Sequence, residues 1–190
     1  MKLKCKFDRQ RALPLILTGF VIILDQITKA IIATTAIGSR IWPSPESGLF
    51  HSDNILRIIH VRNTAIAFSI GHDFPDPVKR LLFVLLPVIV LVILVLYYLS
   101  SNEFTRLQRW AVAGILGGGI GNMIDRIFRP EGVVDFIDVR FFGILGFERW
   151  PTFNVADTSV VVSCILLLIT IIAGTRKSVP DYSVEEQAKE

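Results

Sequence analysis

The sequence predicts an α-helical membrane protein with four transmembrane helices and a small extracytoplasmic sheet, in a single domain spanning residues 1–190. Two observations carry this prediction. Of the 190 residues, 52% are hydrophobic and 19% are charged, whereas an ordinary soluble domain carries roughly 25% charged residues. The hydrophobic residues are also gathered in long blocks, and a bilayer core of about 30 Å needs about 20 apolar helical residues to cross it. This composition excludes a disordered chain.

Four blocks have the required length. The second contains no charged residue, whereas the first is interrupted by Asp25 and Lys29 and the third ends near Asp125 and Arg126. A cleaved signal peptide is the alternative for the first block, but the run is long for one and no A-x-A-like site follows it. We therefore expect transmembrane helices at 13–33, 81–99, 110–128 and 155–175, and extracytoplasmic segments at 34–80 and 129–154.

The basic residues orient these helices. Five of the first 12 residues are Lys or Arg, which favours a cytoplasmic N-terminus. With four crossings the C-terminus lies on the same side, although Lys79 and Arg80, just outside the second block, run against this orientation. The net charge of +3 is interpreted as an orientation signal, because no basic stripe with interleaved aromatic residues indicates a nucleic-acid partner.

The two extracytoplasmic segments have strand character. Residues 55–62 are rich in β-branched side chains, and residues 133–142 form a second strand-like run. We expect a small sheet outside the membrane. The apolar stretch 141–147 and Trp150 suit a structure that lies on the membrane surface.

Polar residues from three of the helices gather at one depth. Asp25 lies 12 residues beyond Leu13, roughly 18 Å along a helix that rises ~1.5 Å per residue, which places it in the outer half of the membrane. Ionisable residues there are costly and mark functional sites by default. The cluster consists of Asp25 and Lys29, of Asn122, Asp125 and Arg126 at the end of the third helix, and of Asn154 and Asp157 at the start of the fourth.

Each member of this cluster also has a structural interpretation. Asp25 and Lys29 could neutralise each other as an i,i+4 pair. Asp125 and Arg126 could be interfacial residues at a helix end. Asn154 and Asp157 have the spacing of a helix N-cap followed by an acidic third residue.

Several kinds of chemistry are excluded. The glycines of the third helix, Gly114, Gly117, Gly118 and Gly121, have small-xxx-small spacing and predict close helix packing. A phosphate-binding loop would need a Lys-Ser/Thr ending that the sequence lacks. The three histidines form no metal-ligating pattern. Carboxylate chemistry remains, with no metal ion and no organic cofactor expected.

Among the carboxylates, Asp135 and Asp157 are the best candidates for catalysis. Asp135 is the only polar residue on its face of the strand 133–142, whereas Asp138 shares a face with Arg140 and is expected to be a solvated or paired surface charge. Burial raises the pKa of a carboxyl, while a helix N-terminus favours an ionised Asp157. We expect Asp135 to hold a proton and Asp157 to be ionised. The two carboxylates of an aspartyl hydrolase share one proton in this way.

Five motifs follow one another between residues 25 and 157: DQITK at 25–29, NTAIAF at 63–68, GNMIDR at 121–126, VVDF at 133–136 and FNVAD at 153–157. Together they resemble the bacterial lipoprotein signal peptidases (signal peptidase II). The resemblance implies an aspartyl protease with four transmembrane helices and an extracytoplasmic β-cradle, located in the bacterial inner membrane with its active site near the extracytoplasmic face. Such enzymes remove the signal peptide from diacylglyceryl-modified prolipoproteins by cutting before the lipidated cysteine.

The resemblance also implies roles and partners. Asp135 and Asp157 fall on the catalytic dyad of the family, and no cofactor is needed. Expected partners are the prolipoprotein, membrane lipid and a globomycin-type inhibitor. The supporting polar positions are Asp25, Asn63, Asn122, Asp125, Arg126 and Asn154, with Lys29 beside them.

The sequence departs from the family pattern in two places. Ala65 and Ile66 replace the usual glycine and alanine, and the segment 140–152 is longer than usual. Two other functions are compatible with intramembrane carboxylates: a small transporter or proton relay, for which no repeated halves are visible, and a non-catalytic assembly factor.

Overall fold

The computed structural model describes residues 8–43, 55–64 and 74–177. The departure from the family pattern at Ala65 and Ile66 lies outside these residues. So do most of the basic N-terminal arm and the last 13 residues, 178–190.

Helices occupy all four of the predicted blocks, with some differences at their ends. α1 (Arg9–Ile32) and α4 (Arg106–Phe128) each begin four residues earlier than predicted. The reason is polar capping, which hydropathy does not detect: Asp8 accepts a hydrogen bond from the Arg11 amide, and Thr105 forms a capping box with Gln108. α5 (Val155–Lys177) begins where predicted and runs two residues further.

The second block is longer than predicted and not uniformly α-helical. It consists of α2 (Asp76–Arg80), a π-helical turn η3 (Leu81–Leu85) and α3 (Leu86–Ser100). The boundary predicted at 81 was therefore wrong, because Lys79 and Arg80 belong to the helix. Pro87 has no amide hydrogen to donate one turn back, and the wider turn directly precedes it.

In the described part of the chain, three helices are long and apolar enough to cross a membrane: Arg9–Ile32, Pro77–Ser100 and Val155–Ala173. The predicted third span is a helix of sufficient length, α4, but its glycines and polar residues set it apart from these three by composition. α4 packs mainly against α5 and α1, and much of it is buried. Its composition is therefore that of a helix surrounded by other helices.

The glycines of α4 allow this close packing, as predicted. A Cβ atom on Gly117 would lie 2.8 Å from the Cβ of Val21 in α1. A Cβ atom on Gly118 would collide with the backbone carbonyl oxygen of Ala156 in α5. Both distances are shorter than the contacts that real Cβ atoms make. A larger residue at either glycine would therefore force its neighbour, Val21 or Ala156, to move.

The sheet is small and antiparallel, with the order β1 (Arg40–Trp42), β2 (Leu56–Asn63), β3 (Val133–Val139). The predicted strands 55–62 and 133–142 are confirmed in their centres. β3 ends at Val139 because the chain continues into a hairpin in which Arg140 pairs with Arg149. Asn63 pairs with Val133 at the end of β2, which brings it close to Asp135.

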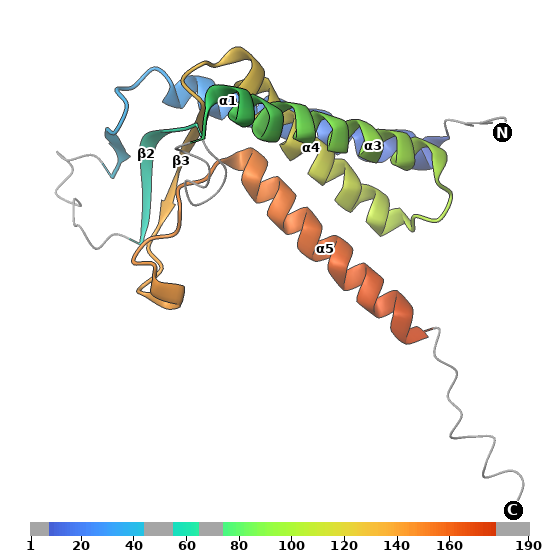
Figure 1. Ribbon diagram of the computed structural model, residues 1–190. Coiled ribbons are helices and arrows are strands. Elements are labelled where there is room, and N and C mark those ends of the chain that lie inside the picture. The colour runs from blue at the N-terminus through green and yellow to red at the C-terminus, as the bar shows by residue number, and fades with distance from the viewer. Residues whose placement is uncertain (1–7, 44–54, 65–73, 178–190) are drawn as a thin grey trace, which may run out of the picture.

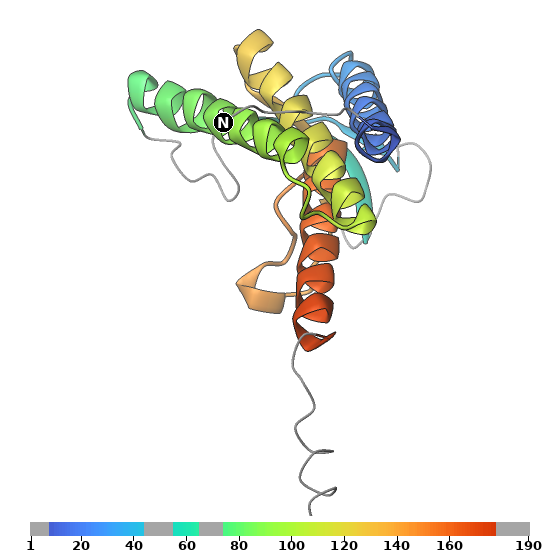
Figure 2. The ribbon, with the colours of Figure 1, turned by 90° about the vertical axis from the view of Figure 1, so that its right-hand side faces the viewer.

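The sheet lies at one end of the helices, which we call the sheet end (Figure 1). α4 packs against both α1 and α3. α5 starts at the sheet end, packs against α4 as far as Ser163, and then diverges from the other helices (Figures 1 and 2). Contacts of α4 with both α1 and α5 hold this arrangement together. The C-terminal end of α1, the C-terminal end of α4 and the N-terminal end of α5 thus meet beside β3.

The packing of α4 against α5 predicts that Gly118→Ala destabilises the protein. The added methyl group meets a backbone carbonyl that cannot move aside, so we expect a loss of about 1–3 kcal/mol, as for other overpacked sites. Thermal unfolding in detergent measures it. Gly19→Ala in α1 is the control, because a Cβ there meets no atom within 4 Å. Equal melting temperatures for the two variants would contradict the packing argument.

Candidate active site

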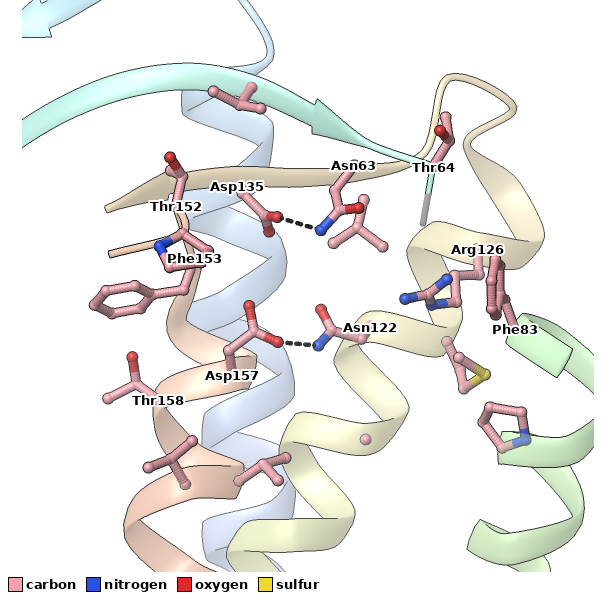
Figure 3. A pocket seen from close by; sticks show the side chains of 18 of the residues that line it. Asn63, Thr64, Phe83, Asn122, Arg126, Asp135, Thr152, Phe153, Asp157 and Thr158 are labelled. Carbon is pink, nitrogen blue, oxygen red and sulfur yellow. Dashed lines mark hydrogen bonds between the residues drawn. The ribbon is translucent and has the colours of Figure 1, made fainter. Parts of the chain in front are cut away.

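A cleft of about 1440 Å³ opens between the sheet end of the helices and β2, β3 and the 140–149 hairpin. Its polar part contains Asn63, Asn122, Arg126, Asp135 and Asp157 (Figure 3). The rest is apolar and is lined by residues of α3, α4 and α5 such as Leu86, Val90, Ile115 and Val161. Two carboxylates therefore stand at the polar end of a largely apolar cleft.

Asp135 projects from β3 into this cleft and is 3% exposed. Both of its carboxylate oxygens accept hydrogen bonds. The Asn63 amide nitrogen donates to one oxygen at 3.0 Å, and the Asn154 amide nitrogen donates to the other at 2.7 Å. One amide comes from the neighbouring strand β2 and the other from the residue that precedes α5. Together they fix the carboxylate, which is directed toward the cleft (Figure 3).

Asp157 lies in the first turn of α5 and is held by two neighbouring polar residues. Asn154 caps the helix: its side-chain oxygen accepts from the backbone N–H of Asp157 at 2.9 Å, and its backbone N–H donates to the Asp157 carboxylate at 3.1 Å. The capping interpretation is therefore correct, but it is not the whole role of the pair. The Asn122 side-chain amide of α4 also donates to Asp157, at 2.7 Å.

Asp135 and Asp157 face each other across the polar end of the cleft (Figure 3). Burial, and after it the negative charge of Asp157, raise the pKa of Asp135 to about 7, while the hydrogen bonds from Asn63 and Asn154 act in the opposite direction. Asp135 therefore retains its proton up to neutral pH.

Lys29, Asp25 and Asp125 form a buried ion cluster behind the cleft. The Lys29 ammonium lies 2.9 Å from Asp25 and 3.0 Å from Asp125, and all three side chains have no exposed surface. The i,i+4 pair of the first helix thus exists, but it is joined by a second carboxylate from α4. The interpretation of Asp125 as an interfacial residue is wrong, because this carboxylate is enclosed.

This ion cluster is linked to the cleft through Asn122. The Lys29 ammonium donates to the side-chain oxygen of Asn122 at 2.9 Å, so the amide nitrogen of Asn122 is turned toward Asp157. Asp25 also accepts from the backbone amide of Ala156 at the start of α5. Lys29 and Asp25 therefore position the residues around the dyad without lining the cleft themselves.

Arg126 is separated from its neighbour Asp125 and lines the cleft with Asn122. Its guanidinium lies 5.7 Å from the centre of the Phe83 ring and points into the cleft (Figure 3). Asn122 and Arg126 are four residues apart on α4, so their side chains share one face of the helix. A permanent cation at this position can orient a carbonyl or carboxylate group of a bound peptide.

Asp138 was expected at the surface and is instead 2% exposed. It is paired, as one alternative predicted, but its partners are Arg57 of β2 and Arg149 of the hairpin rather than a residue of its own strand. The strand pairing that brings Arg57 opposite Asp138 is not visible in a local pattern. Asp138 therefore fastens the hairpin to the sheet, away from the dyad.

Sequence reasoning missed two residues of the ion cluster. Gln26 donates from its amide nitrogen to Asp25, to Asp125 and to the backbone carbonyl of Gly121, and Arg129 pairs with Asp125. The position of Gln26 inside the DQITK motif was the available signal. In the residues that the structure describes, no group of three or more His, Cys, Asp or Glu residues is arranged to hold a metal ion.

Comparison with known proteins identifies the family. The family model described as signal peptidase (SPase) II matches residues 17–173. The chain belongs to the signal peptidase II family. All five motifs and every polar residue of the site lie inside the matched range.

Two relatives support this membership, and one solved structure is similar to the chain over most of its length. The chain is 44% identical over 164 residues to the lipoprotein signal peptidase of Treponema pallidum, covering 86% of this chain and 84% of the relative. It is 47% identical to that of Treponema denticola, covering 84% and 88%. A bacterial membrane enzyme solved by the in meso method at 2.3 Å resolution is 30% identical, with a TM-score of 0.71, covering 89% of this chain and 93% of the other.

The ion cluster predicts that Lys29→Met destabilises this signal peptidase II family member strongly. Removing the ammonium leaves two buried carboxylates without their cation, which costs about 3–5 kcal/mol when one partner of a buried pair is lost. Thermal unfolding in detergent measures the loss. Arg80→Met, at an exposed position near the start of the second long helix, is the control and is expected to leave the melting temperature within a degree or two, as for surface substitutions. A similar melting temperature for both variants would contradict the role of Lys29.

Proposed function

We propose that this protein is an aspartyl endopeptidase of the membrane that removes the signal peptide from diacylglyceryl-modified prolipoproteins, cutting before the lipidated cysteine. Family membership supports the removal of signal peptides from lipoproteins. The observation that carries the aspartyl mechanism is the meeting of Asp135 and Asp157 at the polar end of one cleft. Their environments differ, as the acid and the base of such a mechanism require.

The dyad assigns one step to each carboxyl. Asp157, held by Asn122 and by the start of α5, is the base that takes a proton from water as the water oxygen attacks the carbonyl carbon. Asp135 donates its proton to the carbonyl oxygen, and a tetrahedral intermediate forms. When this intermediate collapses, the C–N bond breaks and the nitrogen takes the proton that Asp157 received from water, while Asp135 regains a proton from the hydroxyl group that becomes the new carbonyl. The products are a carboxyl group on the signal peptide and an amino group on the lipidated cysteine, and the dyad returns to its starting state.

The apolar part of the cleft suits a substrate that arrives from the lipid. Leu86, Val90 and Val161 line it along the helices, so a signal-peptide helix or an acyl chain can lie there while the peptide bond reaches the dyad. A substrate anchored at this depth needs no passage through water. The same cleft is the expected site of a globomycin-type inhibitor.

We further propose that α4 is the fourth transmembrane helix. It is 23 residues long and lies between two candidate spans, α1 and α5. The sheet end then faces the extracytoplasmic side of a bacterial inner membrane, and both termini face the cytoplasm. The transporter interpretation receives no comparable support, because Lys29, Asp25 and Asp125 are closed off in mutual ion pairs.

The mechanism predicts that Asp135→Asn and Asp157→Asn each abolish cleavage. An amide can neither accept the proton of water nor donate one to the carbonyl oxygen, so we expect losses of at least ~100-fold for either variant, the lower end of general acid–base effects. Cleavage of a diacylglyceryl-modified prolipoprotein in detergent measures it. Glu148→Gln, a residue with 76% side-chain exposure in the nearby hairpin, is the control. Normal cleavage by the dyad variants would show that these aspartates are structural.

The raised pKa of Asp135 predicts the alkaline limit of activity. Asp135 must be protonated, so cleavage is expected to fall as the pH rises through about 7. Asn63→Ala removes a hydrogen bond that lowers this pKa, and should therefore move the alkaline limb to higher pH. Rates measured from pH 5 to 9 test it, with Thr64→Ala as the control on the same wall of the cleft. An unmoved or lowered limb in Asn63→Ala would contradict the assignment of the proton to Asp135.

A further inference from the structure

The hairpin between β3 and α5 presents a group of apolar side chains outward. Its tip contains the 3₁₀ turn η4 (Ile144–Gly146). Leu145 is 79% exposed, and Phe142 and Ile144 are both more than half exposed. Three large exposed apolar side chains within four residues of one loop form the kind of patch that marks an interaction surface.

The hairpin is rigid enough to hold this patch in place. Backbone hydrogen bonds link Phe141 to Glu148 and Gly143 to Phe147, and the backbones of Arg140 and Arg149 form an antiparallel β-bridge. At its base the Trp150 ring packs on the rings of Phe141 and Phe147 at 4.9 and 6.2 Å. The exposed side chains are therefore part of an ordered structure.

Two of the exposed residues at the tip have an unfavourable backbone conformation. Phe142 and Leu145 both have φ of 54°, a left-handed conformation that residues with large side chains rarely adopt. Such strain persists where the surrounding structure enforces it and is a pointer to function. Here it turns two apolar side chains away from the protein.

The position of the hairpin indicates lipid as the partner. Only residues 151–154 separate Trp150 from Val155, the first residue of the candidate span α5, and five Cα-to-Cα steps reach at most about 18 Å. In both Figure 1 and Figure 2 the hairpin projects to the side of the molecule on which α5 leaves the other helices. The tip is thus held near the membrane surface beside that helix.

The composition of the hairpin fits the same partner. Apolar side chains occupy the tip, and aromatic rings and two arginines occupy the base. The guanidinium of Arg140 lies 5.1 Å from the centre of the Phe142 ring. Aromatic and basic residues next to an inserted apolar group are typical of structures that lie in the headgroup region.

We propose that the tip of this hairpin, Phe142, Ile144 and Leu145, inserts into the outer leaflet of the membrane as a separate lipid contact beside the helices. Since Phe147 and Trp150 line the cleft, the bilayer then holds one wall of the cleft at a fixed depth. The insertion is independent of the catalytic role proposed for the dyad, and its test does not use activity.

The test places a fluorescent label at the tip. In full-length protein with Cys5→Ser and Cys164→Ser, Leu145→Cys carries the environment-sensitive dye NBD, and the protein is reconstituted into phosphatidylcholine vesicles. Lipids brominated near the headgroup or near the methyl end of the acyl chain then report depth. We expect a blue-shifted emission and roughly threefold stronger quenching by the shallow bromines than for the label at Glu148→Cys, because insertion of this kind is shallow.

Two further measurements keep the outcome decisive. Ile144→Cys is a second reporter at the tip, in case the label at position 145 disturbs the turn. We expect it to give the same shallow depth. Phe142→Asn weakens the patch with a residue that tolerates the left-handed conformation, and should reduce quenching at 145 without lowering the melting temperature. Emission at both tip positions that matches water, with quenching no stronger than at 148, would overturn the proposal. Quenching that disappears when the protein is diluted to one copy per vesicle would also overturn it, because the tip would then contact a second copy of the chain.

Discussion

The burial of a single ammonium group, that of Lys29, constrains the structure around the cleft. A charge without exposed surface must be compensated on all sides, and the compensation here comes from two helices: Asp25 of α1 and Asp125 of α4. The remaining direction is filled by the side-chain oxygen of Asn122. This last contact determines which way the amide group of Asn122 faces, and therefore that Asp157 receives an N–H donor rather than a carbonyl oxygen.

Asn154 performs the corresponding task at the other carboxylate. Its oxygen starts α5 by capping the helix, and its amide nitrogen donates to Asp135. One side chain thus fixes the start of the helix that carries Asp157 and holds the carboxylate that faces it. Helix capping and site geometry cannot be separated here, and the close approach of α4 to α5 at Gly118 lets Asn122 and Asn154 come within 3.2 Å of each other.

Much of this arrangement could be predicted from the sequence, for identifiable reasons. Long apolar blocks revealed the helices, and the alternation of side chains along a strand distinguished Asp135 from Asp138. The rest depended on contacts between distant segments. The burial of Asp138 by Arg57 and Arg149 follows from strand pairing, and the role of Gln26 follows from the packing of α1 on α4. Helix starts were misplaced where a polar cap, such as Asp8, lay outside the apolar block.

The divergence of α5 has a consequence for how such a protein would be supplied with substrate. Beyond Ser163 most of the described helix surface is exposed and apolar, as at Ile165, Leu168 and Ile172, so in the bilayer that the proposed function requires, lipid would reach this part of α5 and the cleft at its start. A reactant that reaches the cleft by this path is dissolved in two dimensions. Its effective concentration is a mole fraction in the leaflet, and adding inert lipid or detergent would slow turnover by dilution even when the amounts of protein and substrate in the tube are unchanged.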